Sequence, residues 1–232
     1  EEQCEALRAS ILKGHLTLLN YALQFGYSYD RWQTIINALL EKDPGSPKIH
    51  RLRVIHLYEW DFNLLLGVKW KQLLHRMCDN NAINPSIYGG VPGHTTLDPV
   101  FIREMEYELT RLIRQPLVHF DNDAKLCYDQ IVHAIAILSM LRLGILLAPL
   151  VSMFKVLQGA VYKIRTAYGD STTTCTSPPQ EPYQGVGQGN GAGPAIWMLI
   201  SIPLINMLRT QGSGFKSTNI LSGEDYQFAC YT

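Results

Sequence analysis

The stretch PLVHFDNDAKLCYDQIVHAI, residues 116–135, decides how the rest of this chain is interpreted. Its apolar beginning, residues 116–120, has the length of a buried β-strand and ends at three polar residues, after which a helical pattern begins. Because side chains alternate along a strand, Asp121 and Asp123 would point to one face and Asn122 to the other. The pattern therefore predicts carboxylates held at a strand end, and a divalent cation such as Mg²⁺ needs oxygen ligands of this kind.

Helix capping is a second interpretation of the same polar residues. Asp and Asn often precede a helix, because their side-chain oxygens accept hydrogen bonds from the first free backbone N–H groups. Taken alone, Asp121 or Asn122 is as compatible with a cap as with a metal ligand.

The spacing that follows Asp123 bears on this choice. The segment Asp-Ala-Lys-Leu-Cys-Tyr-Asp, residues 123–129, resembles the first catalytic motif of reverse transcriptases. In that motif an aromatic residue lies five positions after the first Asp, and a second Asp lies six positions after it. The resemblance implies that Asp123 binds metal, that the backbone carbonyl of Ala124 also contacts the metal, and that Tyr128 senses the sugar. Cys127 stands where Ala is more usual, and it is small and apolar enough for that place.

Composition sets the bounds of the interpretation. A chain of 232 residues with 47% hydrophobic content can form one large domain or two small ones. The formal net charge is zero, so a nucleic-acid-binding surface would have to come from local clusters of basic residues. Five cysteines without a C-x-x-C pair indicate neither a disulfide framework nor a zinc site, which favours a reducing compartment.

Both ends of the chain look cut. The chain opens with EEQCEALRAS, which is neither an initiator Met nor a secretory signal, and it closes on the strand-like run YQFACYT. We therefore expect a piece of a longer polypeptide that is intracellular, in cytoplasm or nucleus, and not secreted.

The first third of the chain alternates predicted helices with one basic ribbon. Helical periodicity predicts helices over residues 7–25, 28–41 and 59–77, and Pro and Gly predict a turn over 43–47. Apolar and basic residues alternate over 48–57, which predicts a strand with a basic face.

The basic face has two interpretations. Lys48, Arg51 and Arg53 are candidates for contacts with phosphates, but a solvated edge strand carries the same pattern. The segment RVIHL, residues 53–57, resembles an Arg-Pro-Ile-x-Leu-like segment in the fingers of retrotransposon reverse transcriptases, with Val54 in place of Pro. Residues 88–98 resemble the family's Gly-rich turn, and a fingers helix is expected to follow over 99–114.

The region 129–161 is strongly apolar. About 20 apolar residues can span a bilayer, so a membrane segment is one interpretation. Arg142 lies near the middle of the region, however, and a central Arg costs ~3 kcal/mol on insertion scales. A buried helix, a turn near 144–149 and a second helix explain the pattern better. Residues 161–174 then predict a strand with a tight turn at Gly169-Asp170, similar to a strand pair between the family's first two motifs.

Five glycines at alternate positions form a loop over residues 185–193, before an apolar helix predicted over 194–208. The loop lacks the Lys of a P-loop. Gly187-x-Gly189-x-x-Ala192 matches the dinucleotide fingerprint, but neither the preceding strand nor the acidic residue of that site is present. Gln188-Gly189 followed by Pro194 resembles the second polymerase motif, in which Gly lets the backbone approach the nascent base pair. A flexible linker is the remaining interpretation, and the apolar helix that follows at once argues against it.

The resemblance implies an α+β, helix-rich chain with a small antiparallel sheet and the right-hand fold of polymerases. Residues 1–115 would be a fingers-like region with N-terminal helices, and residues 116–232 a partial palm that is truncated before the Tyr-x-Asp-Asp motif. The implied activity is RNA-directed DNA polymerisation with two Mg²⁺ ions, acting on a template with primer and deoxynucleoside triphosphates. Gln188 and Gly189 would line the templating pair. We expect this piece to be inactive by itself; an inactive nucleic-acid-binding remnant and a polytopic membrane segment are the alternatives.

Overall fold

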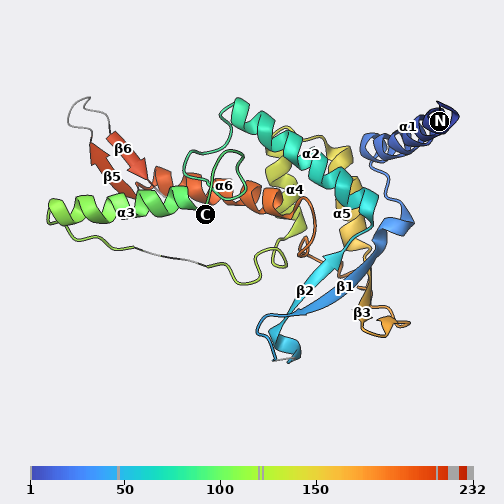
Figure 1. Ribbon diagram of the computed structural model, residues 1–232. Coiled ribbons are helices and arrows are strands. Elements are labelled where there is room, and N and C mark those ends of the chain that lie inside the picture. Colours follow the sequence, from blue (N-terminus) through green and yellow to red (C-terminus); the bar gives the residue numbers. More distant parts are fainter. Residues whose placement is uncertain are drawn as a thin grey trace. The chain divides into compact units, whose positions relative to one another are not determined.

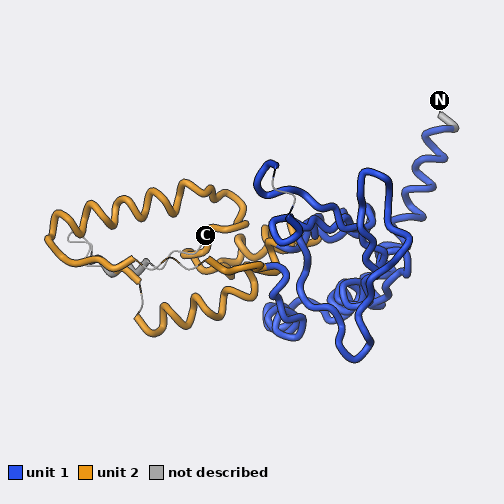
Figure 2. The backbone as a smooth tube through the Cα atoms, turned by 90° about the horizontal axis from the view of Figure 1, so that it is seen from below, with its two compact units in different colours: residues 1–68, 128–193 blue, residues 69–127, 194–232 orange. Residues whose placement is uncertain are grey.

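The computed structural model describes residues 2–45, 48–119, 121, 123–212, 214–218 and 225–228. The chain divides into two compact units, residues 1–68 with 128–193 (unit 1) and residues 69–127 with 194–232 (unit 2) (Figure 2). The fold is α+β. The compact units divide the chain after residues 68, 127 and 193. The division into functional regions between residues 115 and 116 stays a prediction.

Unit 1 contains a four-stranded sheet with the order β2-β1-β3-β4, and Figure 1 labels β1, β2 and β3. Its strands are β1 (Thr34–Glu41), β2 (Leu52–Leu57), β3 (Val161–Thr166) and β4 (Gly169–Asp170). β1 pairs with β2 antiparallel and with β3 parallel. The sheet is therefore mixed, whereas the expectation was a small antiparallel sheet. A parallel neighbour requires a long crossover, and β3 reaches β1 only after the helices that precede it.

The helices of unit 1 supply most of its buried apolar surface. They are α1 (Glu2–Phe25), α4 (His133–Arg142), α5 (Leu147–Gln158) and the first part of α2 (Trp60–Asp79). α5 is buried along most of its length and packs on α1. α4 is buried on one side only: its Ile135 and Leu138 side chains are 55% and 67% exposed. Two helices with a turn between them are present as predicted, but the turn lies over residues 143–146 instead of 144–149, because α5 begins at Leu147 and includes Pro149. No helix in the described part of the chain is long and apolar enough to cross a membrane.

The predicted helix over residues 28–41 is wrong. A short 3₁₀ helix, η1 (Asp30–Gln33), is followed by strand β1 instead. Ile35 is fully buried and pairs with Tyr162 of β3, while Ile36 pairs with Leu57 of β2. β-branched residues favour strands once neighbouring strands are available, and the apolar residues of this segment fit either period.

The β1–β2 connection and the β3–β4 hairpin differ from expectation only at their ends. Turn structure is present over residues 42–45, and residues 46 and 47 lie outside the described part. A 3₁₀ turn, η2 (Ile49–Arg51), precedes β2, so the predicted strand begins at Leu52. The turn was expected at Gly169-Asp170 but lies two residues earlier, at Ala167-Tyr168. Gly169 instead belongs to β4, where it pairs with Thr166.

Unit 2 contains the rest of α2, α3 (Leu97–Leu112), α6 (Gly193–Thr210) and a hairpin of β5 (Phe215–Thr218) and β6 (Asp225–Phe228). Asn84, after α2, is held against α6: its Nδ2 donates to Asn206 Oδ1 at 2.9 Å, and Arg209 Nη1 donates to Asn84 Oδ1 at 2.7 Å. The helices predicted over 99–114 and 194–208 are confirmed. The closing residues 229–232 lie outside the described part.

The predicted strand over residues 116–120 is wrong in its described part. Residues 115–119 are irregular, Val118 is 91% exposed, and the next helix begins only at His133. An apolar run becomes a strand only when a neighbouring strand satisfies its backbone groups, and no strand in the described part pairs with these residues. Without a strand, the alternation that predicted opposite faces for Asp121 and Asn122 does not apply. Phe120 and Asn122 lie outside the described residues.

Candidate functional site

The residues selected from the sequence are divided between the two units. Asp123 and Ala124 belong to unit 2, where both are exposed in the irregular segment before α4. The other candidates belong to unit 1: Lys48, Arg51, Arg53, Tyr128, Gln188 and Gly189. Each unit is described by itself, so the geometry of the site is the geometry of unit 1.

The glycine loop, residues 185–193, is anchored on the segment that contains Tyr128. The Gly185 N–H donates to the Ile131 carbonyl at 2.8 Å, and the Val186 N–H donates to the Tyr128 carbonyl at 2.9 Å. At the other end of the loop, a Cβ on Gly193 would lie 3.7 Å from the Tyr128 ring. Tyr128, the aromatic residue of the first motif, therefore contacts the glycine loop near both of its ends.

The glycine loop is also bonded to β2 and to the residue just after it. The His56 N–H donates to the Gln188 carbonyl at 2.6 Å, which continues the hydrogen bonding of β2 onto the loop. The Tyr58 hydroxyl donates to the Val186 carbonyl at 2.9 Å. Backbone groups of the loop are thus satisfied by partners on a sheet, and the loop has a defined conformation instead of being a flexible linker.

Helix α2 holds the second half of the loop through one side chain. Asn63 Nδ2 donates to the Gly189 carbonyl at 3.1 Å, and the Gly191 N–H donates to Asn63 Oδ1 at 2.6 Å. Asn190 then accepts the Ala192 N–H at 2.8 Å on its Oδ1. This Asn190 bond is a local turn of the kind that commonly precedes a helix, and α6 begins at Gly193.

Two of the loop glycines are required by close approach as well as by backbone angle. Gly189 has φ +111°, and a Cβ there would collide with the His56 carbonyl oxygen. Gly185 has φ +83°, and a Cβ there would lie 2.8 Å from the Asp129 Cα and from the Asp129 carbonyl oxygen. Real Cβ contacts are not this short, so any side chain at either position would push the loop away from its supports.

The Gly189→Ala variant is expected to lose about 2 kcal/mol more stability than the Gly169→Ala variant. Gly169 has φ +114°, so both variants suffer the same strain of Ala at positive φ, ~1 kcal/mol. Only Gly189 meets a backbone oxygen, whereas Gly169 has nothing within 4 Å. Urea unfolding of the two variants measures the difference, and equal losses would contradict the packing of the loop on β2.

A largely uncharged aromatic cluster lies beside the loop. The His56 ring makes an edge contact with Tyr162, with 5.4 Å between ring centroids. Burial lowers the pKa of His56 below its ordinary value of 6.5, although the negative charge of Asp129 opposes this shift. Burial also raises the pKa of Tyr58, and it raises the pKa of Tyr162 to about 12. The shifts in the pKa values of His56, Tyr58 and Tyr162 all favour the uncharged forms of these side chains.

Most of this cluster was not identified from the sequence. His56 lies within the basic strand pattern, and Tyr58 and Tyr162 lie in ordinary apolar contexts, so no spacing marks them. The buried Nδ1 of His56 has no hydrogen-bond partner among the described residues. Asp129 is the exception: it is the second Asp of the first motif, and its position in that motif is the one feature of the sequence that marks it.

The basic face of the sheet is larger than the sequence indicated. Lys48, Arg51 and Arg53 are all exposed, and Arg51 forms an exposed ion pair with Asp43 at 3.2 Å. Exposed pairs of this kind contribute little to stability. β3 adds Lys163 and Arg165 to the face that carries Arg53. The three basic residues pair with alternate residues of β1, and residues paired in register share a face. Leu40 pairs with Arg53, Ile36 with Lys163 and Ala38 with Arg165.

The two candidate metal ligands, Asp123 and Ala124, lie among the described residues. No group of three His, Cys, Asp or Glu side chains within them is placed to hold a metal ion. Proteins usually bind Mg²⁺ through one or two carboxylates, with substrate phosphates and water completing the octahedron. The exposed Asp123 carboxylate and the Ala124 carbonyl fit this partial role, which stays a prediction.

A scan against models of protein families gave no match for this chain, and a comparison with curated proteins gave none either. The residues of the chain and their geometry are thus the basis for proposing its function.

Proposed function

We propose that this chain forms the fingers and part of the palm of an RNA-directed DNA polymerase of the non-long-terminal-repeat retrotransposon type. The contact between the two sequence motifs carries the proposal: the Tyr128 carbonyl accepts the Val186 N–H at 2.9 Å, and the Tyr128 ring lies beside Gly193. A polymerase needs its sugar-sensing aromatic and its Gly-rich loop at the same nucleotide. In unit 1 the last two residues of the first motif, Tyr128 and Asp129, thus lie against the glycine loop.

The glycine loop is suited to bind a base pair by shape. Its backbone is bonded to β2 and α2 on one side, through His56 and Asn63, while Gly189 is exposed. A rigid loop without side chains at alternate positions presents a flat surface, and it needs little reorganisation when the nucleotide arrives. In this proposal Gln188 and Gly189 line the templating pair, and Tyr128 lies under the sugar.

The basic face binds the phosphates of the template and primer. Arg53 and Lys163 share one face of the sheet, and Lys48 and Arg51 precede the same strand. Phosphate contacts position a nucleic acid without reading its sequence, which suits an enzyme that copies any template. Two bound Mg²⁺ ions would activate the primer 3′-hydroxyl and neutralise the triphosphate, with Asp123 and the Ala124 carbonyl as their ligands from this chain.

Primer extension tests the proposal. The natural full-length protein should add deoxynucleotides to an RNA-templated primer in the presence of Mg²⁺. It should also bind the primer–template with an affinity that falls steeply with salt, because phosphate neutralisation releases counterions. Salt-dependent binding without nucleotide addition would instead identify an inactive remnant. Absence of both would refute nucleic-acid binding by the basic face.

Tyr128 is expected to exclude ribonucleotides. The Tyr128→Ala variant should raise the ratio of ribonucleotide to deoxynucleotide incorporation at least about tenfold, because the ring occupies the space that a 2′-hydroxyl needs and each tenfold corresponds to ~1.4 kcal/mol. Tyr128→Phe keeps the ring and should keep the wild-type ratio. Single-nucleotide incorporation kinetics measure both. If Ala and Phe leave the ratio equally unchanged, Tyr128 serves only the packing of the glycine loop.

A further inference from the structure

Helix α1 carries two apolar stripes, and only one of them packs against unit 1. The inner stripe includes Leu19 and Ala22, which are 7% and 0% exposed, and it faces α5. The second row, the outer stripe, recurs at steps of four and three residues along the helix: Leu7, Ile11, Gly14, Leu18, Tyr21 and Phe25.

The outer stripe is exposed along its whole length. Leu7, Ile11, Leu18, Tyr21 and Phe25 are 62%, 64%, 56%, 49% and 61% exposed. Single exposed apolar residues are ordinary, but five large ones in a row along one helix mark an interaction site. The rings of Tyr21 and Phe25 pack together, with 4.7 Å between their centroids, so the stripe ends in an aromatic pair.

The spacing of the outer stripe specifies the shape of its partner. Steps of four and three residues repeat every seven, which is the heptad of a coiled coil, with Ile11, Leu18 and Phe25 at a positions and Leu7, Gly14 and Tyr21 at d positions. Such a seam packs against another helix with the same 3.5-residue period and fits a flat sheet poorly.

We propose that the outer stripe joins two copies of this chain through a two-stranded coiled coil of α1 with α1. A heptad seam is self-complementary, so a second copy offers the matching surface without any other partner. The exposed fractions correspond to roughly 600 Å² per copy, or about 1,200 Å² for both, which reaches the lower end of the range for stable dimers. α1 has 24 residues, enough for three heptads. The pairing does not depend on the proposed polymerase activity.

Sedimentation velocity of the protein under reducing conditions tests the proposal, since a reductant prevents cross-linking through the exposed Cys4. The wild type should pass from monomer to dimer between about 1 and 100 µM. Ile11→Glu combined with Leu18→Glu should raise the dissociation constant at least about 100-fold, because it places carboxylates in the seam. Both positions are exposed in the single chain, so its fold should survive, and circular dichroism checks its helicity.

The matched control is Ala6→Glu combined with Asn20→Glu, which adds the same charge to exposed positions of the same helix outside the outer stripe. This control should dimerise like the wild type. A wild type that stays monomeric throughout the range overturns the proposal. A dimer that the stripe variant leaves intact, or one that the control weakens equally, overturns it as well, because the contact would then lie elsewhere or depend on charge alone.

Discussion

The Asp123→Asn variant of the natural full-length protein is expected to lose at least about a thousandfold of its rate of nucleotide addition. Asn keeps the shape of Asp but has no charge, so it is a poor ligand for the hard cation that two-metal transfer requires. Binding of the primer–template should change by less than about twofold, because affinity comes from basic residues and backbone contacts to phosphates. Rapid-quench kinetics and equilibrium binding measure the two quantities separately.

Asp79→Asn is the control for this prediction. Asp79 is an exposed carboxylate at the end of α2, in the same unit as Asp123, and it lies in neither motif. Its replacement changes the net charge by the same amount and should leave nucleotide addition unchanged. If Asp123→Asn retains full activity, Asp123 is not a metal ligand. If the two variants lose activity equally, the effect is one of overall charge.

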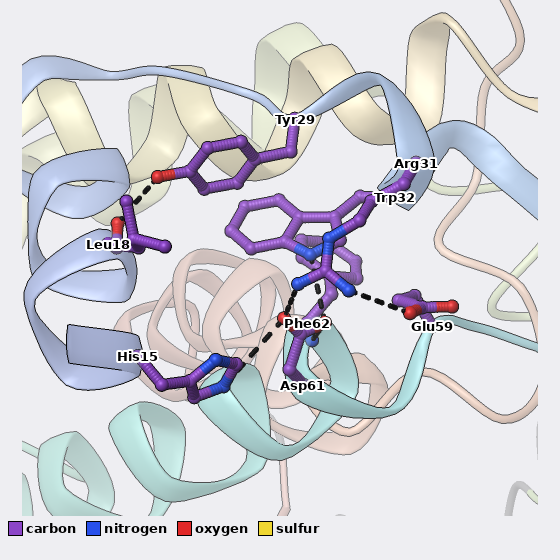
Figure 3. A network of polar contacts seen from close by, with 8 residues as sticks. All are labelled: His15, Leu18, Tyr29, Arg31, Trp32, Glu59, Asp61 and Phe62. Carbon is purple, nitrogen blue, oxygen red and sulfur yellow. Dashed lines mark hydrogen bonds and ion pairs between the residues drawn. The ribbon is translucent and has the colours of Figure 1, made fainter. Parts of the chain in front are cut away.

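The Asp61→Ala variant is expected to lose about 3 kcal/mol of unfolding free energy. Asp61 is 3% exposed and accepts hydrogen bonds from Trp32 Nε1 at 2.9 Å and from the Phe62 N–H at 2.8 Å (Figure 3). It also pairs with the Arg31 guanidinium, and His15 Nε2 lies 3.9 Å away. Without the carboxylate, the N–H of the fully buried Trp32 has lost its acceptor, and a buried unsatisfied donor costs ~1–3 kcal/mol. The loss of the bond at the start of α2 adds to this cost.

Glu59→Ala is the matched control for Asp61. Glu59 binds the same Arg31 guanidinium at 2.9 Å, but both of these side chains are about half exposed, at 42% and 55%. An exposed pair contributes ~1 kcal/mol or less, so the control should lose far less stability than Asp61→Ala. Urea unfolding with a common m value compares them. Equal losses would mean that the network is held by its exposed ion pair instead of by the buried carboxylate.

This network also supports the candidate site. Trp32 lies in η1, directly before β1, and Asp61 lies in the first turn of α2, the helix that carries Asn63 to the glycine loop. The carboxylate therefore fixes the start of the helix that holds the loop. In the sequence Asp61 is one of two acidic residues in a basic region, and no pattern distinguishes it from a surface charge.

Most of the helices could be predicted from the sequence, because a helix closes its hydrogen bonds within four residues and its buried face repeats every 3.6 residues. α2, α3 and α6 follow this rule, and their predicted ranges agree with the structure to within a few residues. The order of the two motifs along the chain is likewise a property of the sequence alone. It selected Tyr128, Gln188 and Gly189, which the structure places in one compact unit.

The strands and the supports of the loop were decided by tertiary structure. Residues 34–41 became a strand because residues 52–57 and 161–166 pair with them, whereas residues 116–119 have no strand partner in the described part of the chain and are irregular. A strand satisfies its backbone groups on other segments, so its existence depends on what lies beside it. The same holds for His56 and Asn63: both support the glycine loop through contacts across more than a hundred residues of chain, which no local pattern in the sequence records.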